Sequence, residues 1–410
     1  MGGDQVGAVT LVDDGPRALT DSAPSGLHSA NVAIVHDYLN QRGGAERVVL
    51  EMSDMWPNAP IYTSLYRPGS TFPAFGDREI RATRLNRMPV DRGFRNLLPL
   101  YPAAFHGLGE IDADVVVASS SGWAHLARTS RRTLHAIYCH TPARWLYGRD
   151  YLGHRGAMSV KQAIAQPVLG KLARLDREAA RRADLYIANS ENVKRLIRST
   201  YGIEAVVVPP PVDVDRFSPT PRGARILMVT RLLPYKNVAI VVRAATRLGI
   251  GLDVVGDGPL LGQLSELAGP SVKFHGPVAD EAVVELMERC SAVCVAAEED
   301  FGIVSVEAQA AGKPVIAYGR GGSLETVSEG LTGVFFREQT EESLIAAIRA
   351  AEALETSPSV IATHARRFSR AAFRVRLETV LEKALDEFRP ATRDPEPAFR
   401  PRRESVLSAA

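Results

Sequence analysis

Two glutamates eight positions apart are the strongest candidates in this chain for catalytic or ligand-binding side chains. Glu299 and Glu307 follow the apolar run 291–297. This run predicts a buried parallel strand, and residues 304–312 predict the start of a helix. One carboxylate would then lie at the carboxyl end of a strand and the other on the next helix. Open α/β sheets bind ligands at that rim, so the pair predicts a ligand site.

The residues between the glutamates favour this interpretation over the ordinary one, in which both are solvated surface side chains. Phe301 and Gly302 lie where the strand would end, and glycine accepts backbone dihedral angles that other residues avoid. Ala308 and Gly312 would let the helix pack closely on the sheet. We therefore expect the backbone to approach a ligand here.

Two cations occupy a similar position earlier in the chain. Arg231 follows an apolar strand predicted over 226–230, and Lys236 stands just before a helical stretch over 238–248. A strand end facing a helix N-terminus suits a diphosphate, because backbone N–H groups and the helix dipole add to the cationic charge. Arginine binds phosphate through paired hydrogen bonds, whereas lysine acts as a movable point charge. An isolated pair of this spacing is usually solvated. This pair precedes the two glutamates in the chain, and that order favours a ligand-binding role.

In this order the two motifs resemble the signatures of retaining GT-B glycosyltransferases of family four. Gly256 and Gly258 lie between them and match the family's Gly-x-Gly turn, although the glycines alone are typical of ordinary turns. The resemblance implies that the cations stabilise the leaving diphosphate, that Glu299 contacts hydroxyls of the transferred sugar, and that Glu307 binds the nucleotide ribose. The residues it assigns to donor binding are Gly43, Gly44, Arg231, Lys236, Gly256, Gly258, Glu299, Phe301, Gly302, Ile303, Val304 and Glu307.

The N-terminal half repeats the strand-and-helix pattern with different chemistry. A strand predicted over 32–36 is followed by Gly43 and Gly44, which open a helix with apolar residues on one face. Most glycine pairs are ordinary turns, and the Gly-x-Gly-x-x-Gly dinucleotide fingerprint is missing here, which counts against a dehydrogenase. In the resembling enzymes this loop approaches the donor phosphate or the acceptor from the opposite domain.

A histidine marks the end of another predicted strand. Residues 114–121 and 134–139 are two strands that run into polar ends, and His140 follows the second. A histidine is more often a hydrogen-bonded core residue than a catalyst, but the resembling family often places one near the transferred sugar. We therefore expect a functional role. The catalytic residues implied by the resemblance are His140, Arg231, Lys236 and Glu299.

The segment that begins at His140 resembles a bacterial subgroup of mannosyltransferases that build polysaccharides and glycolipids. Residues 140–147 read His-Thr-Pro-Ala-Arg-Trp-Leu-Tyr. The likeness implies GDP-mannose as the nucleotide-sugar donor and a glycan or lipid-linked acceptor in cell-envelope biosynthesis. The residues it assigns to acceptor binding are His36, Tyr38, Arg144 and Trp145.

Other functions fit part of the pattern. A UDP-sugar could replace GDP-mannose as the donor. A sugar-nucleotide epimerase would need no acceptor, and a phosphorylase of this fold would need a pyridoxal-phosphate lysine, for which we identify no site. A non-catalytic sugar-nucleotide binder would have no reason to keep both cations and both glutamates. No Asp-x-Asp metal motif is apparent near a strand end, so we expect no required metal, and no cofactor besides the nucleotide-sugar co-substrate.

The length of 410 residues suits two domains with tails. Short apolar runs alternate with helical stretches in both halves, which predicts parallel sheets. With the resemblance, the predicted fold is an α/β GT-B fold in which two Rossmann-like parallel-sheet domains face a central cleft. The predicted parts are a disordered tail (1–29), an N-terminal acceptor-binding domain (30–208), a C-terminal nucleotide-sugar domain (209–370), a helix returning to the N-terminal domain (371–389) and a disordered tail (390–410).

The overall composition is that of a globular protein in a reducing compartment. Hydrophobic residues make up 45% of the chain and charged residues 23%. The three cysteines suit the cytoplasm. No run reaches the ~18 apolar residues that a membrane-spanning helix needs, and residues 1–29 do not have the pattern of a signal peptide. We therefore expect a cytoplasmic protein.

The segment Arg78–Arg95 carries six arginines, with large apolar residues between and after them. Such a surface could bind anionic lipid headgroups, which attract each nearby cation by about 1 kcal/mol, or it could be a solvated face over an ordinary core contact. The first interpretation predicts peripheral attachment to the inner face of the cell membrane. We do not expect nucleic acid as a partner, because no nucleic-acid motif accompanies the arginines.

Overall fold

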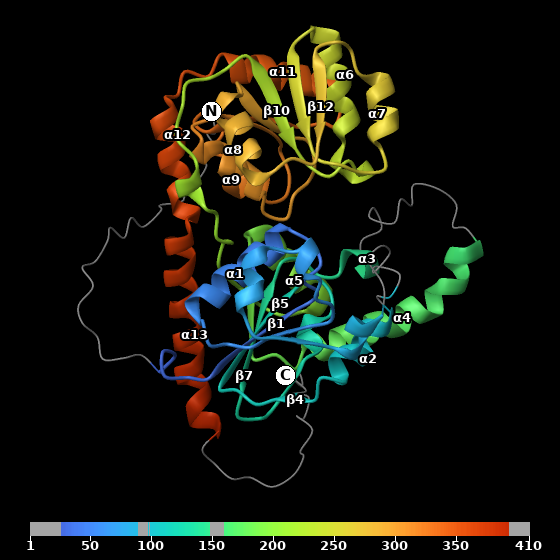
Figure 1. The fold of residues 1–410 in the computed structure, drawn as a ribbon, viewed down its shortest axis with the longest axis vertical. Coiled ribbons are helices and arrows are strands. Elements are labelled where there is room, and N and C mark those ends of the chain that lie inside the picture. The colour runs from blue at the N-terminus through green and yellow to red at the C-terminus, as the bar shows by residue number, and fades with distance from the viewer. Residues whose placement is uncertain (1–25, 89–96, 98, 148–159, 393–410) are drawn as a thin grey trace, which may run out of the picture.

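The computed structural model describes residues 26–88, 97, 99–147 and 160–392. It contains two domains, one above the other in Figure 1, each built on a parallel sheet with helices on both faces. The strands of both sheets are almost continuously apolar, as expected for parallel strands that are covered on both sides. The predicted α/β fold with two parallel-sheet domains is therefore confirmed.

The N-terminal domain has a parallel sheet of seven strands. In spatial order these are β3 (Ile80–Ala82), β2 (Ile61–Thr63), β1 (Val32–His36), β5 (Val115–Ser120), β7 (Leu134–Cys139), β8 (Leu185–Ala188) and β9 (Val206–Val207). The domain also contains α1 (Gly44–Met55), α2 (Tyr101–His106), α3 (Arg144–Tyr147), α4 (Val160–Ala180), α5 (Glu191–Tyr201) and the short pair β4 (Glu110–Ile111) and β6 (Arg128–Thr129). Helix α1 and the C-terminal helix α13 (Arg370–Thr392) cover one face of the sheet, and α2 and α5 cover the other.

The C-terminal domain has a parallel sheet of six strands. In spatial order these are β12 (Val272–Gly276), β11 (Gly251–Val255), β10 (Arg225–Val229), β13 (Ala292–Val295), β14 (Val315–Tyr318) and β15 (Gly333–Phe336). Its helices are α6 (Val238–Leu248), α7 (Leu261–Leu267), α8 (Asp280–Arg289), α9 (Ile303–Ala310), α10 (Ser323–Thr326), α11 (Glu341–Glu352) and α12 (Pro358–Ala365). Helices α6, α7 and α11 pack on one face, and α8, α9 and α12 pack on the other.

Both sheets reverse their strand order at an equivalent place. Strand β1 lies between β2 and β5, and β10 lies between β11 and β13. Open α/β sheets form their ligand crevice at this reversal, beyond the carboxyl ends of the strands. The residues predicted to do chemistry follow these same strands, so the topology explains why they gather.

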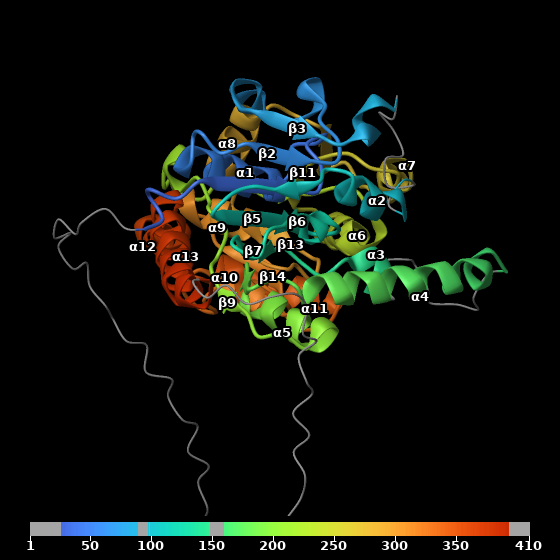
Figure 2. The same ribbon diagram turned by 90° about the horizontal axis from the view of Figure 1, so that it is seen from below.

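The two connections between the domains run side by side. Val212, on the first connection, pairs with Ser369, which precedes α13. The Val212 amide donates a hydrogen bond of 2.9 Å to the carbonyl oxygen of Phe368. Helix α13 then runs along the N-terminal domain (Figures 1 and 2), where Phe373 and Leu377 enter the core. The predicted return of the chain to the first domain is confirmed.

Two predicted boundaries need correction. The tail predicted over 1–29 is shorter, because Leu27 is 1% exposed and belongs to the core of the N-terminal domain. The return helix begins at Arg370 and extends to Thr392, beyond its predicted end at residue 389. Residues 1–25 and 393–410 lie outside the described residues.

Candidate active site

A cleft of about 1020 Å³ lies between the two domains, at the carboxyl ends of their strands. This is the central cleft that the sequence predicts. The predicted site residues that line it are Tyr38, Gly43, Gly44, His140, Arg144, Trp145, Arg231, Lys236, Glu299, Phe301, Gly302, Ile303, Val304 and Glu307. Three further predicted residues, His36, Gly256 and Gly258, lie behind its walls.

The predicted cation pair lies on the C-terminal wall, after β10. The Nζ atom of Lys236 is 2.6 Å from Oε1 of Glu299, so the lysine is joined to the first glutamate of the motif. Arg231 is exposed, and its Nη2 donates a hydrogen bond of 3.1 Å to the Tyr235 hydroxyl. An anionic ligand would therefore meet one cation that is already paired with an acid and one that faces solvent.

Two helices begin at the cleft from opposite domains. Helix α1 has Gly43 as its N-cap, and α9 has Gly302. Neither cap has a side chain to accept from the first amides, but Glu46 lies in the first turn of α1, with its carboxyl group close to Gly43. The start of α9 has no acid in its first turn, so its helix dipole is the more available of the two to an anion. The two starts are also close, because a Cβ added to Gly44 would lie 2.7 Å from Cδ1 of Ile303.

Gly256 and Gly258 pack against the loop that carries Arg231 instead of lining the cleft. Gly256 has a φ of 126°, and a Cβ at this position would lie 2.0 Å from the Thr230 carbonyl oxygen. A Cβ on Gly258 would lie 2.5 Å from the Leu232 carbonyl oxygen. The predicted donor contact therefore needs correction: the two glycines allow a close approach of two loops, which fixes the cation from behind.

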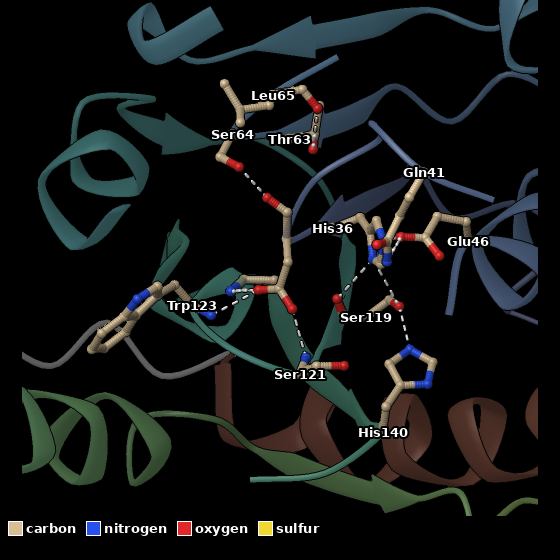
Figure 3. A network of polar contacts seen from close by, with 12 residues as sticks. His36, Gln41, Glu46, Thr63, Ser64, Leu65, Ser119, Ser121, Trp123 and His140 are labelled. Atoms are coloured by element: carbon tan, nitrogen blue, oxygen red, sulfur yellow. Dashed lines mark hydrogen bonds and ion pairs between the residues drawn. The ribbon is translucent and has the colours of Figure 1, made fainter. Parts of the chain in front are cut away.

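His140 lies on the N-terminal wall, after β7. Its Nε2 is 2.7 Å from Oγ of Ser119, which in turn is 3.1 Å from Nδ1 of His36 (Figure 3). Burial and the nearby charge of His36 lower the pKa of His140 to about 3. The imidazole is therefore neutral near pH 7, and it lines the cleft; its predicted contact with the transferred sugar stays a prediction.

His36 forms a buried ion pair instead of the predicted acceptor contact. The residue is 2% exposed, and its Nε2 lies 3.7 Å from Oε1 of Glu46. Burial lowers the pKa of His36, but Glu46, Asp37 and the Ser119 carbonyl together raise it above its usual value. The prediction is wrong because the ring points behind the wall of the cleft, toward another buried charge.

Asp37 is a cleft residue that the sequence did not identify. Its carboxylate accepts hydrogen bonds from the amides of Ser121, Trp123 and Ala124 at 2.6, 2.7 and 2.7 Å (Figure 3). These charge-assisted bonds hold the loop after β5 against the end of β1. The ring of Trp123 is thereby fixed beside that of Trp145, with 5.3 Å between centroids. An aspartate after an apolar strand is the only sequence signal for this role.

Arg144 joins the two domains, although the resemblance assigns it to the acceptor. Its Nη2 lies 2.5 Å from Oδ1 of Asp300, the residue after Glu299. The Ser190 hydroxyl donates a second interdomain hydrogen bond, of 2.6 Å, to the Asp300 carbonyl oxygen. Burial raises the pKa of Asp300, and Arg144 opposes that shift. Asp300 is thus a second functional candidate that sequence reasoning missed.

Two further polar contacts cross between the domains. Arg47 on α1 is 3.0 Å from Asp280 on α8. The Glu325 carboxylate accepts hydrogen bonds of 2.7 and 2.8 Å from the amides of Glu191 and Asn192, at the start of α5. The domains therefore contact each other through charged groups beside the cleft as well as through their connections.

Glu307 lies on α9 with its side chain at the cleft. Burial raises its pKa, whereas the charges of Arg47 and Arg216 act in the opposite direction. A carboxylate in this setting has acceptor capacity for ligand hydroxyl groups. The ribose contact that the resemblance implies stays a prediction.

The described residues offer no grouping of three or more His, Cys, Asp or Glu side chains that could hold a metal ion. The expectation of a metal-free reaction stays a prediction. No helix within the described ranges is long and apolar enough to cross a membrane.

The predicted lipid-binding segment Arg78–Arg95 is only partly described, because residues 89–96 lie outside the described residues. Arg78 is 2.5 Å from Asp54, and Arg81 is 2.6 Å from Glu79. Arg84 and Arg87 are exposed on a short 3₁₀ turn. Two arginines are therefore held by neighbouring acids, while two face solvent.

Two known protein families match this chain, and their matches meet at residues 215–216, on the connection between the two domains. Residues 42–216 match the family described as Glycosyltransferase Family 4. Residues 215–372 match the family described as glycosyl transferases group 1. Each match falls on one domain.

Curated relatives share part of this chain. The D-inositol 3-phosphate glycosyltransferase of Geodermatophilus obscurus is 32% identical over 203 residues, which are 41% of this chain and 45% of that protein. The protein of the same name from Mycobacterium bovis is 33% identical over 223 residues, 46% of each chain. The chain therefore matches about half the length of these relatives, and their names do not include a mannosyltransferase.

Solved structures share the fold over most of the chain. Anabaena HepE, crystallised with UDP and glucose, superposes with a TM-score of 0.65 at 18% identity and covers 86% of this chain and 99% of its own. Sucrose-phosphate synthase from Thermosynechococcus elongatus gives 0.67 at 16% identity, with 87% and 100% coverage. At these identities the likeness establishes the fold.

Proposed function

We propose that this chain, which has the GT-B fold and resembles glycosyltransferase family 4 and group 1 in its two domains, transfers a sugar from a nucleotide sugar with retention of anomeric configuration. The observation that carries the proposal is the convergence of two glycine-capped helix starts with Arg231 and Lys236 on one cleft. Such a set of positive groups suits the diphosphate of a nucleotide sugar.

The cations act on the charge that develops during transfer. The bond between sugar C1 and the phosphate oxygen breaks, and a bond between C1 and the acceptor oxygen forms on the same face of the sugar. The acceptor hydroxyl gives its proton to the departing phosphate oxygen. Negative charge grows on the diphosphate as the bond lengthens, so preorganised positive groups stabilise the transition state more than the ground state.

Three side chains hold the sugar and the nucleoside in this scheme. Glu299 contacts sugar hydroxyls, and its ion pair with Lys236 keeps both side chains in place before the donor arrives. Glu307 accepts from the ribose hydroxyls. His140 reaches the sugar from the opposite wall.

For the donor we place GDP-mannose first, because residues 140–147 resemble mannosyltransferases of bacterial polysaccharide and glycolipid assembly. A UDP-sugar is the second candidate, since HepE, with the same fold, has been crystallised with UDP-glucose. Calorimetry of the full chain with each donor separates the two. Tight binding of a UDP-sugar and none of GDP-mannose would reverse the order.

The transfer itself is tested with labelled GDP-mannose, UDP-glucose and UDP-N-acetylglucosamine, each with and without a membrane extract. We expect label in an acceptor product with one of them. Conversion of the donor without an acceptor would indicate an epimerase. Binding without any turnover would indicate a non-catalytic sugar-nucleotide binder.

For the acceptor we propose a lipid-linked or glycan molecule at an anionic membrane surface. The neighbouring rings of Trp123 and Trp145, tilted by 57° to each other, give the N-terminal wall an aromatic surface suited to a sugar ring. Charge reversal of the exposed Arg84 and Arg87 should release the chain from anionic vesicles and leave donor binding unchanged, because the attraction is electrostatic and is screened over ~8–10 Å. Failure of the unchanged chain to sediment with vesicles at low salt would favour a soluble acceptor.

A further inference from the structure

His140 ends a chain of buried side chains whose hydrogen-bond roles determine where its proton lies. The chain runs from Glu46 through His36 and Ser119 to His140, across the carboxyl ends of β1, β5 and β7 (Figure 3). We propose that these contacts keep His140 neutral with its proton on Nδ1, so that it presents a hydrogen-bond donor to the cleft. The use of this donor rests on the proposed sugar transfer.

The strand register brings the middle two residues together. Strands β1 and β5 are parallel neighbours in which His36 lies directly opposite Ser119. Nδ1 of His36 is 3.1 Å from the carbonyl oxygen of Ser119 and 3.1 Å from its hydroxyl oxygen. A carbonyl oxygen can only accept a hydrogen bond, so Nδ1 of His36 carries a proton.

Glu46 lies beside the other nitrogen of His36. Its Oε1 is 3.7 Å from Nε2 of His36, and accepts a hydrogen bond of 2.9 Å from the Gln41 side chain. Glu46 is 1% exposed, so this contact is buried and helps to fix the orientation of the ring. With its proton on Nδ1, His36 cannot accept a hydrogen bond from Ser119.

The Ser119 hydroxyl is left with one acceptor. Its oxygen receives the proton of His36 and lies 2.7 Å from Nε2 of His140. The hydroxyl proton cannot be donated to His36, and Nε2 of His140 is the other side-chain partner of this hydroxyl among the described residues, so we assign the proton to that contact and leave Nε2 unprotonated. A neutral imidazole carries one proton, which then lies on Nδ1.

Nδ1 of His140 lies on the side of the ring away from Ser119 (Figure 3). Within the described part of the chain no group forms a hydrogen bond with this nitrogen, and His140 lines the cleft. An N–H at this place can bind an oxygen of the transferred sugar, but it cannot take a proton from the acceptor. His140 would then hold the sugar and leave the proton to the departing phosphate, while Glu46, His36 and Ser119 act as positioning residues.

Nitrogen NMR of the full chain with ¹⁵N-labelled histidine tests the assignment without any substrate. The long-range proton–nitrogen pattern distinguishes the two neutral tautomers and the doubly protonated ring, and His140→Gln identifies the signals of His140. We expect the Nδ1–H tautomer for His140 and a proton on Nδ1 of His36. An Nε2–H tautomer or a charged ring at His140 would overturn the proposal.

Two serines on the same strand make a matched pair of variants. Ser119→Ala removes the donor to His140, and Ser120→Ala removes a hydroxyl that contacts His125 instead, at 3.2 Å. We expect a mixture of His140 tautomers in Ser119→Ala alone, and a loss of roughly 10-fold in the rate of sugar release from the donor in that variant. An unchanged tautomer in Ser119→Ala would refute the relay. Absence of donor turnover in the unaltered chain would refute only the proposed function, since the spectra do not depend on it.

Discussion

On the N-terminal wall of the cleft the polar side chains are buried and bonded to one another, whereas on the C-terminal wall they stand nearer to solvent. His36, Ser119 and His140 are at most 9% exposed. The side chains of Lys236 and Glu299 are 14% and 24% exposed. Arg231 is more exposed than either.

The difference matches two kinds of recognition. Sugar hydroxyls are distinguished by the positions of single donors and acceptors, so the groups that bind them benefit from a rigid and fully bonded network. A diphosphate is bound by charge, and a cation that keeps part of its hydration avoids the cost of being buried alone before the ligand arrives. Changes on the C-terminal wall should therefore affect activity, while changes on the N-terminal wall should affect stability as well.

The largest effect is expected from removing a cation of the C-terminal wall. Arg231→Ala and Lys236→Ala should each lower kcat/KM by ~100-fold, about 2.7 kcal/mol, because the transition-state diphosphate loses a positive partner. Thermal unfolding should change little. Arg247→Ala is the control, because Arg247 lies in the same domain, paired with Glu342 and largely exposed. Near-normal turnover in both test variants would contradict the diphosphate site.

The next effect concerns the stability of the N-terminal wall. Asp37→Asn replaces one acceptor oxygen by a donor that faces a backbone amide, so at least one of the buried hydrogen bonds is lost. We expect the free energy of unfolding to fall by about 2 kcal/mol. Denaturant titration measures this, with the exposed Asp77→Asn as control. Equal stability of the two variants would show that the carboxylate does not hold the loop.

Glu307 sharpens the comparison, because it lies on the C-terminal wall yet its pKa is raised by burial. Its folded-state pKa is raised, so its contribution to stability is present below the ordinary glutamate pKa and is lost as pH rises through the folded-state pKa. Glu307→Gln does not titrate. The difference in Tm, that of Glu307→Gln minus that of the unaltered chain, should therefore increase as pH rises from the ordinary glutamate pKa to the folded-state pKa. The kcat/KM of the variant should be roughly 10-fold lower, because the ribose loses a hydrogen-bond acceptor.

The measurement for Glu307 is a series of Tm values from acidic to neutral pH. Glu352→Gln, an exposed position on α11, is the control. A Tm difference that is independent of pH would contradict the raised pKa. An unchanged kcat/KM would show that Glu307 does not contact the ribose.

The smallest effect is expected where the two walls meet. The side chains of Arg144 and Asp300 are 31% and 21% exposed, so water screens their ion pair. A double-mutant cycle with Arg144→Gln and Asp300→Asn should give a coupling of about 1 kcal/mol in kcat/KM. Strictly additive losses would show that the pair does not link the domains during turnover.

The sequence predicted the C-terminal wall more completely than the N-terminal one. Strand β10 and helix α6 follow the predicted pattern, and Arg231, Lys236 and Glu299 line the cleft. These residues lie within short segments at the ends of strands, so local pattern and resemblance are enough to identify them. The loops that follow β10 and β13 are short, so the positions of these residues relative to the strand ends can be predicted from the sequence.

The N-terminal network depends on which strands are neighbours, and the sequence does not contain that information locally. Parallel strands covered on both sides are apolar throughout and lack an alternating pattern. Nothing in residues 32–36 therefore indicated that His36 faces Ser119 rather than the cleft. Glu46 and Asp300 likewise have their partners, His36 and Arg144, in segments distant in the sequence, so no local pattern identifies them.

The pairing of Val212 with Ser369 turns two crossings of the chain into a single joint. We expect any relative rotation of the two domains to take place about this joint, because the two segments are paired there. Helix α13 lies on the side of that joint, and α3, with Arg144, lies on the far side in both views (Figures 1 and 2). A rotation at the joint should therefore change the distance between Arg144 and Asp300 more than distances close to α13, so that distance would report opening of the cleft.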